Sequence, residues 1–598
     1  MEKQKTEYQC KSKLPITKYA ESRAGLFGMF LLMALWFDAV IAGSVLLGGG
    51  RLGPWIFPVS LVLALIGNTL LSADRRRGIA ASAIGVLFMA AAIAVCQAVY
   101  DTTFDSMGYH YDISVMLTDG WNPINETPPN GSVWAAHYAK LLELTGATVL
   151  AFTGNLQTAK CVNFSLAAAA LALMWSTVRM IWPKISAKWR IILVVIAALN
   201  PVAIRQMLSF YNDFCIWFET ILLICAFLRL YRDETDIFAW LVLFFAIGLG
   251  INTKFTHFFY LGVECIVFAV WLLCFKRFAL FRRCMVVAVA GLAVGVAVIG
   301  FNPYVTNTTG YLSPFYPLIG GDGVDIMTAN TPAMFTGGNR FEYFAKSLLS
   351  LPDMSWALLR GDVTAEGLKA SYVGDMRVNG FGVLMFPCLV IGLILMIINR
   401  PSKRWWMVYG LVFAMSLLFE QSWWARYIPF LWLALIIPVI ISLLGQKSRT
   451  RLNRILRTAV FLLVCANGAV SGALTLASRL AYTHYINYVF TTQKALGKPI
   501  ETVNLTPTMR QQFRERGIAF TERRSIGAIA DKSHLFRVFG IDYFDSWMLL
   551  PEQEYPLLYT KPRTILDGLA RYPLRRYAPS GDSVSYTHLR AHETDQYL

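Results

Sequence analysis

IAASAIGVLFMAAAIAVCQAVY, residues 79–100, leads directly into DTTFDSMGYHYD, residues 101–112. A helix needs roughly 20 apolar residues to cross a bilayer, so the first stretch predicts a membrane-spanning helix. The second stretch gathers carboxylates and an imidazole where that helix ends, at Asp101, Asp105, His110 and Asp112. Such carboxylates are either solvated loop groups or groups that accept a proton from a hydroxyl or bind a divalent cation. Their number predicts a chemical site at the membrane surface.

The composition predicts an all-α polytopic membrane protein. Of the 598 residues, 56% are hydrophobic and 15% are charged, whereas soluble proteins average roughly 25% charged residues. The formal net charge is +17, but the basic residues cluster in short loops between apolar runs. This distribution follows the positive-inside rule, so we expect membrane lipids as partners and no nucleic acid. The ten cysteines show no spacing typical of a disulfide framework or a cysteine metal site.

Apolar runs predict a GT-C-like number of crossings, about 13 transmembrane helices. The runs lie at about 26–47, 54–71, 79–100, 161–182, 190–203, 214–230, 237–252, 258–275, 284–300, 381–399, 405–419, 427–444 and 458–476. Every second loop is basic, which places the N-terminus and those loops in the cytoplasm. Two long loops, at about 101–160 and 301–380, then lie outside what we expect to be a bacterial cytoplasmic (inner) membrane.

The chain divides into four predicted parts. Residues 1–25 form a cytoplasmic N-terminal segment, and residues 26–476 form the transmembrane domain. Residues 477–584, where Pro, Gly and charged residues return to soluble proportions, form a small extracytoplasmic domain of mixed structure. Residues 585–598, SYTHLRAHETDQYL, resemble translated sequencing-adapter sequence and are interpreted as a non-native tail.

Three further residues on the predicted outer side are candidates for the site, each with a plainer alternative. Asp213 begins an apolar run, so it is also a candidate helix cap. Lys254 breaks the charge rule and is either a phosphate-binding cation or a snorkelling lysine. Arg426 breaks the same rule. Its planar fork suits bidentate contact with phosphate, and the alternative is a pair with Glu420 or non-specific contact with lipid phosphate.

No motif of a soluble enzyme competes with a membrane site. The chain has no Walker A loop, no GxGxxG after a strand, no HExxH and no GxSxG elbow. The outer side of a bacterial membrane lacks ATP and nucleotide sugars. Group-transfer chemistry on that side therefore has to draw on a lipid-carried donor.

Five short motifs occur in one order on the predicted outer side. They are Asp105 with Tyr109-His110 and Asn122-Pro123, Gln206-Met-Leu-Ser209 with Asn212-Asp213, Gly250-Ile-Asn-Thr-Lys254, Ser313-Pro-Phe-Tyr-Pro317, and Arg426-Tyr427-Ile-Pro429. Over residues 79 to 445 the chain resembles the GT-C superfamily of membrane glycosyltransferases. The nearest groups are the bacterial relatives of protein O-mannosyltransferases and the lipid A aminoarabinose transferase.

The resemblance implies an inverting hexosyl- or pentosyltransferase that moves a sugar from a polyprenyl-phosphate donor to a glycan, lipid or protein. It implies that Asp105 is the general base, that Asp213 orients the acceptor, and that His110 orients Asp105 or contacts a phosphate oxygen. Lys254 and Arg426 would stabilise the departing lipid phosphate. The accessory residues would be Asp112, Gln206, Asn212, Tyr316 and Tyr427. No cofactor is certain, and a divalent cation (Mg²⁺ or Mn²⁺) between Asp105 and Asp213 stays open.

Two other function classes compete with this one. A transporter or flippase of lipid-linked sugars would be expected to show inverted repeats and charges near the membrane midplane. The chain has no clear internal repeat, and its intramembrane charges, Asp38, Glu219 and Glu264, are few and scattered. A polysaccharide polymerase or ligase would rely on outer arginines more than on a carboxylate base.

Overall fold

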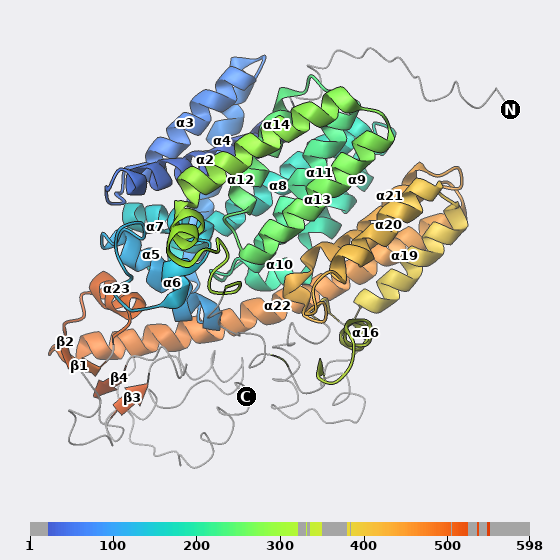
Figure 1. Cartoon of the computed structure of the whole chain (residues 1–598). Coiled ribbons are helices and arrows are strands. Elements are labelled where there is room, and N and C mark those ends of the chain that lie inside the picture. Colours follow the sequence, from blue (N-terminus) through green and yellow to red (C-terminus); the bar gives the residue numbers. More distant parts are fainter. Residues whose placement is uncertain are drawn as a thin grey trace, which may run out of the picture.

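The computed structural model describes residues 22–320, 331, 335–349, 380–382, 384–503 and 505–523, together with the backbone of 535–537 and 547–549. Within this part the chain is almost entirely helical (Figure 1). The first 21 residues of the predicted cytoplasmic segment and the predicted tail at 585–598 lie outside the described residues, as does much of the predicted loop at 301–380.

Seven helices of the described part are long and apolar enough to cross a membrane. They are α2 (Arg23–Leu47), α4 (Arg75–Ala98), η2 with α8 (Leu156–Ile181), α11 (Asp213–Arg232), α13 (Phe255–Cys274), α14 with η3 (Phe278–Ile299) and α22 (Arg451–Ala495). Shorter helices occupy the other predicted runs: α3 (Ile56–Leu71), α9 (Ala187–Ala198), α12 (Ile237–Gly250), α19 (Met385–Asn399), α20 (Lys403–Ser416) and η7 with α21 (Pro429–Leu444). The helical class is confirmed, and the seven candidate spans support a membrane protein. The count of thirteen crossings stays a prediction.

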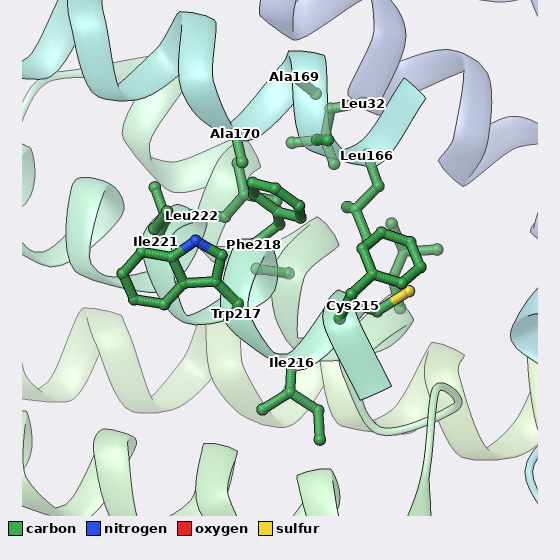
Figure 2. Packing of buried hydrophobic residues seen from close by; sticks show 14 of the residues in the cluster. Leu32, Leu166, Ala169, Ala170, Cys215, Ile216, Trp217, Phe218, Ile221 and Leu222 are labelled. Atoms are coloured by element: carbon green, nitrogen blue, oxygen red, sulfur yellow. The ribbon is translucent and has the colours of Figure 1, made fainter. Parts of the chain in front are cut away.

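Helix α11 lies at the centre of the bundle, and its mostly apolar residues are buried around almost the whole helix. Trp217, Phe218 and Leu222 are buried. Figure 2 shows Ala170 of α8 beside Phe218 and Leu222, and Ala169 of α8 beside Leu32 of α2. Small residues allow close approach of helices in a membrane, where packing rather than the hydrophobic effect holds them together. The central packing of α11 fixes the position of its first residue relative to the bundle.

Three of the basic loops that were predicted to be cytoplasmic lie together at one end of the bundle. Arg277, between α13 and α14, pairs with Glu234, between α11 and α12, at 2.7 Å. Arg404, in α20, lies over the ring of Phe275, with Cζ 4.4 Å from the ring centroid. These contacts bring three basic loops together. The opposite end of the bundle is the one where α11 and α13 begin.

The predicted outer loop at 101–160 contains a buried apolar helix. Helix α7 (Leu141–Thr153) has 13 residues and ends at Gly154, which is left-handed with a φ of 69°. This length is below the roughly 20 residues of a membrane span, so an apolar run alone did not predict it. It packs against α5 (Tyr111–Thr118) and η2. The loop is therefore partly built into the helical core.

The C-terminal part adds a small mixed unit at one end of α22 (Figure 1). Strand β1 (Ile500–Val503) pairs in parallel with β2 (Phe520–Arg523) across the connecting helix α23 (Pro507–Arg516). With β4 (Trp547–Leu549) and β3 (Leu535–Arg537), the strand order is β2-β1-β4-β3. Helix α22 runs unbroken through the predicted domain boundary at 477, and the mixed unit begins at β1.

Two carboxylates hold α23 against the bundle. Asp112 of α5 accepts a hydrogen bond from the backbone N–H of Thr508, near the start of α23, at 2.9 Å. In return, Glu515 of α23 accepts one from the N–H of Leu156, at the start of η2, at 2.6 Å. The first N–H groups of a helix have no partner within that helix. Asp112 therefore satisfies a free donor of α23, and Glu515 satisfies a free donor of η2. Asp112, predicted as an accessory residue, serves in docking.

Docking of α23 is expected to weaken as the pH rises. Burial raises the pKa of Asp112 to about 6 and the pKa of Glu515 to about 7. A carboxyl whose pKa is raised by folding stabilises the folded state below its unfolded pKa of roughly 4, and that contribution is lost as the pH rises through the folded value. Each group then changes stability by roughly 3 kcal/mol between about pH 4 and pH 8. Hydrogen–deuterium exchange in α23, corrected for intrinsic rates, should be faster at pH 8 than at pH 5.5.

The control is Glu515→Gln combined with Asp112→Asn. Both substitutions keep an oxygen that accepts the backbone hydrogen bond but remove the titrating group. We expect exchange in α23 to lose most of its pH dependence in this protein. If the dependence stays as large as in the unsubstituted chain, these carboxyls are not its source.

Candidate active site

Four residues predicted for the site form one cluster of alternating charge. Arg426 Nη2 lies 2.7 Å from Asp105 Oδ2, and Arg426 Nε lies 2.8 Å from Asp213 Oδ2. Lys254 Nζ donates a hydrogen bond to Asp213 Oδ1. We call Asp105, Asp213, Lys254 and Arg426 the ionic cluster. Its two carboxylates balance its two cations, which is what buried charges require.

Each member of the ionic cluster lies where a helix starts. Asp105 precedes η1 (Ser106–His110), Asp213 begins α11, Lys254 precedes α13, and Arg426 lies in the single turn η6 (Ala425–Tyr427). Polar residues are tolerated at these positions because they lie at the ends of the apolar helices and not in their interiors. The arrangement joins residues as far apart as Asp105 and Arg426, 321 positions along the chain.

Asp213 is an ion-pairing residue rather than a simple helix cap. Gln206 Nε2 donates to Asp213 Oδ2 at 2.9 Å, and Gln206 Oε1 accepts from the N–H of Phe214 at 2.8 Å. Gln206 therefore satisfies a free N–H at the start of α11 and leaves the Asp213 carboxylate to the two cations. Gln206, predicted as an accessory residue, contacts the ionic cluster directly.

Lys254 is directed into the protein and not along a membrane surface. Its side chain is only 7% exposed, and its Nζ lies 4.6 Å from the ring centroid of Tyr427, in the range of a cation–π contact. Asn212 Nδ2 donates to the carbonyl of the preceding residue, Thr253, at 3.0 Å. A snorkelling lysine keeps its ammonium group in water, so this geometry argues against the snorkelling alternative, and the phosphate-binding role stays a prediction. The predicted accessory residues Asn212 and Tyr427 both support Lys254.

Arg426 is held by two carboxylates and an aromatic face. Its Cζ lies 5.2 Å from the ring centroid of Tyr211. Burial alone would lower the pKa of Arg426, but Asp213 and Asp105 outweigh burial and raise the pKa well above its ordinary value. The guanidinium therefore stays charged. Its ion pairs are with these two residues and not with Glu420, the alternative partner.

Asp105 is the loop carboxylate that faces the cluster and still meets solvent. Asp101 is fully buried, accepts the N–H of Phe210 at 2.7 Å and pairs with Arg479 at 3.3 Å. Asp112 is occupied by docking of α23. The Asp105 side chain is 15% exposed. Of these three carboxylates, only Asp105 combines contact with Arg426 and access for a second molecule.

His110 lies near the cluster but is paired elsewhere. Its Nδ1 contacts Oε1 of Glu143, and both side chains are almost completely buried. We predicted that His110 orients Asp105 or contacts a phosphate oxygen, whereas the structure places it on Glu143 of α7. The reason is that α7 packs against α5, a long-range contact without a local sequence signal. The His110 ring reaches the site through Tyr211, with centroids 6.2 Å apart.

Tyr316 does not join the cluster through its ring contacts. Its ring stacks on Tyr311 with centroids 3.9 Å apart and meets the edge of His137 at 4.9 Å. Neither partner belongs to the ionic cluster. The predicted accessory role of Tyr316 therefore has no direct contact behind it in the described part of the chain.

Tyr211 is a site residue to which sequence reasoning assigned no role. Its Oη accepts a hydrogen bond from the backbone N–H of Asp105 at 3.2 Å, while its ring faces Arg426. One side chain thus contacts both the candidate base and the candidate phosphate cation. Its place beside Asn212-Asp213 in a polar motif was the available signal. Arg479, the partner of Asp101, had no such signal because it lies on α22 beyond the predicted transmembrane domain.

The predicted metal ligands face a guanidinium instead. Asp105 and Asp213 both contact Arg426, and the charges of Arg426 and Lys254 together compensate theirs. Within the described ranges, no group of three or more His, Cys, Asp or Glu side chains is placed to hold a metal ion. The two carboxylates in this arrangement fit Arg426 and not a divalent cation between them. A requirement for Mg²⁺ or Mn²⁺ stays a prediction.

Removing Glu143 is expected to destabilise the protein. Glu143→Ala leaves the buried Nδ1 of His110 without its partner, and an unsatisfied buried polar group costs about 1–3 kcal/mol. The melting temperature of the detergent-purified protein should fall clearly. Glu143→Gln keeps an oxygen for His110 and should lose much less. Equal melting temperatures for Glu143→Ala and the unsubstituted protein would contradict a structural role for this pair.

Comparison of the chain with protein-family models, curated proteins and solved structures found no match.

Proposed function

We propose that this protein is a membrane glycosyltransferase of the GT-C type. It transfers a sugar from a polyprenyl-phosphate donor to an acceptor hydroxyl on a glycan, lipid or protein, with inversion at the anomeric carbon. The observation that carries the proposal is one partly exposed carboxylate, Asp105, in direct contact with a buried arginine at the end of a bundle of apolar helices. Acid–base chemistry and phosphate binding are thereby combined at one place.

The two cations suit a lipid phosphate as the leaving group. A sugar phosphodiester carries one negative charge, and cleavage of the sugar–phosphate bond adds a second. Arg426 presents a planar fork that can bind two phosphate oxygens, and Lys254 adds a compact charge from the other side of Asp213. Preorganised charge of this kind stabilises a transition state by roughly 3–4 kcal/mol per donor group.

Asp105 supplies the base. The acceptor oxygen attacks the anomeric carbon and forms the new glycosidic bond, and its proton passes to the Asp105 carboxylate. The bond between the anomeric carbon and the phosphate oxygen breaks, and that oxygen keeps the electron pair. The products are the glycosylated acceptor and polyprenyl phosphate, beside Arg426 and Lys254. General base catalysis contributes typically 10²–10⁴-fold in rate.

The donor phosphate and the Asp105 carboxylate compete for one group, Arg426. Asp105 Oδ2 occupies Arg426 Nη2 at 2.7 Å, so a phosphate that takes this nitrogen displaces the carboxylate. The displaced Asp105 carboxylate is then free of Arg426 and can face the acceptor hydroxyl. Asp213, buried and bound by Gln206, Lys254 and Arg426, keeps the cations in place.

The sidedness of the proposed enzyme follows from charge. Three of the basic loops share one end of the bundle, and the positive-inside rule assigns that end to the cytoplasm. The ionic cluster, at the starts of α11 and α13, then faces the outer side of a bacterial inner membrane. A lipid-linked sugar is the kind of donor that is present there.

Asp105→Asn is expected to abolish transfer while it preserves or tightens donor binding. The amide cannot take the acceptor proton, so the rate should fall at least ~10²-fold. It also removes the carboxylate that competes with phosphate for Arg426. Transfer is measured with a radiolabelled polyprenyl-phosphate sugar in detergent micelles, and donor affinity by native mass spectrometry. Asp119→Asn, at an exposed pair with Arg514, is the control and should leave both values unchanged.

Transfer by Asp105→Asn at the control rate would exclude Asp105 as the base. Detergent micelles have no second compartment, so transfer in micelles separates an enzyme from a transporter or flippase. Movement of the lipid-linked sugar across vesicles without transfer in micelles would favour the transporter.

Arg426→Lys is expected to weaken donor binding about tenfold or more. Lysine keeps the charge but cannot pair with Asp105 and Asp213 at once or bind two phosphate oxygens in one plane. The donor KM is the measurement, and Arg514→Lys is the exposed control. An unchanged donor KM in Arg426→Lys would contradict bidentate phosphate contact.

A further inference from the structure

We propose that Glu219 and His257 are positioning residues that set the place of Lys254. The proposal rests on the proposed function only for what Lys254 binds. In the described part of the chain, the polar side-chain atoms of Glu219 and His257 make no hydrogen bond or ion pair with a member of the ionic cluster. They act on the backbone that carries Lys254.

Glu219 contacts Thr253, the residue just before Lys254. Thr253 Oγ1 donates a hydrogen bond to Glu219 Oε1 at 2.7 Å. Lys254 adopts an extended conformation with a φ of −163° and precedes the first residue of α13. The direction of its side chain is therefore decided by the turn at 251–254 and not by a regular helix. Glu219 ties that turn to α11.

Glu219 also contacts His257, three residues after Lys254. His257 Nε2 lies 2.8 Å from Glu219 Oε2, and the N–H of His257 donates to the carbonyl of Lys254 at 3.0 Å. Glu219 Oε1 therefore accepts a hydrogen bond from Thr253, while Glu219 Oε2 lies within ion-pairing distance of His257 but without hydrogen-bond geometry. A closed ring of contacts runs from Glu219 through Thr253, Lys254 and His257 back to Glu219.

Helix α11 is joined to the segment formed by the turn at 251–254 and α13 at two places. One is the ion pair of Asp213 with Lys254; the other is the set of contacts that Glu219 makes with Thr253 and His257, which we call the brace. Helix α11 carries Asp213 at its start and Glu219 six residues further on, about 9 Å along the axis. The turn and α13 carry their partners, Lys254 and His257. Two separated contacts fix the distance and the orientation between two bodies, whereas a single ion pair leaves them free to rotate. Lys254 is thereby held against Asp213 before any ligand arrives.

The burial of Glu219 supports a specific role. Glu219 and His257 are fully buried within helices long enough to span a membrane. Ionisable groups in such positions are costly and generally functional. A nearby pair supplies a matched control, because Thr220 Oγ1 donates to Glu264 Oε1 at 2.8 Å between the same two helices. That pair joins α11 to α13 but has no hydrogen bond to the turn at 251–254.

The test compares Thr253→Val with Thr220→Val. Each removes one hydroxyl donor from one buried glutamate, so general destabilisation should be similar. The first readout needs no substrate: labelling of Lys254 by an amine-reactive reagent, followed by mass spectrometry. In the unsubstituted protein Lys254 is buried and paired and should label slowly. We expect labelling to rise severalfold in Thr253→Val and in Glu219→Ala, but not in Thr220→Val, and to return toward the original rate in Glu219→Gln.

The second readout is the affinity for farnesyl phosphate, a short polyprenyl phosphate, measured in detergent. We expect Glu219→Ala to weaken binding about five- to tenfold. In the double variant with Lys254→Met, the loss should equal that of Lys254→Met alone, because two residues that act through one group are not additive. A residue that only stabilised the fold would add its effect to that of Lys254→Met.

The outcomes separate the two proposals. Equal labelling of Lys254 in Thr253→Val and Thr220→Val overturns the positioning role, whatever the ligand is. Additive losses in the double variant also overturn it. If labelling changes as expected but Lys254→Met binds farnesyl phosphate normally, the brace stands and the phosphate-binding part of the proposed function fails.

Discussion

The neutralisation of Arg426 by Asp105 and Asp213 is the constraint on which the site depends. A guanidinium that is 13% exposed and lies among aromatic rings is expensive without compensating charge. Compensation requires that η1, α11 and η6 meet at one point. Lys254 then balances the second carboxylate, so the turn before α13 is drawn to the same place. Four segments distant in sequence are joined by one requirement, that no charge be left alone.

In the proposed function, the contacts that stabilise the ionic cluster also prepare it for a phosphate. Arg426 is already desolvated and oriented by Tyr211, and Lys254 by Tyr427. Little rearrangement is needed beyond the release of Asp105, which is the most exposed member of the cluster. Preorganised charges cost nothing at the moment of reaction. The burial that makes the charges mutually dependent also excludes water from the bond that the proposed reaction breaks.

Sequence reasoning identified the four cluster residues but not all of their neighbours. Lys254 and Arg426 stood out because they violate a charge rule, and Asp213 because it begins an apolar run. Asp105 was singled out from the loop carboxylates by its position before Tyr109-His110 in the resemblance to the GT-C superfamily. His110 was assigned to Asp105, yet it pairs with Glu143 of α7. A 13-residue apolar helix has no period or length that separates it from a loop segment within a membrane protein, so its contacts could not be anticipated.

Local hydrophobicity and charge were enough to predict the helical class, the approximate positions of the apolar helices and the end of the bundle at which the polar candidate residues gather. Those features follow from local hydrophobicity and charge, which each segment carries alone. Tertiary structure alone decided that Asp105 meets Arg426, that Asp112 holds α23 and that Glu219 braces the turn before Lys254. These pairings join segments up to 396 positions apart, and their geometry depends on how the helices pack around α11.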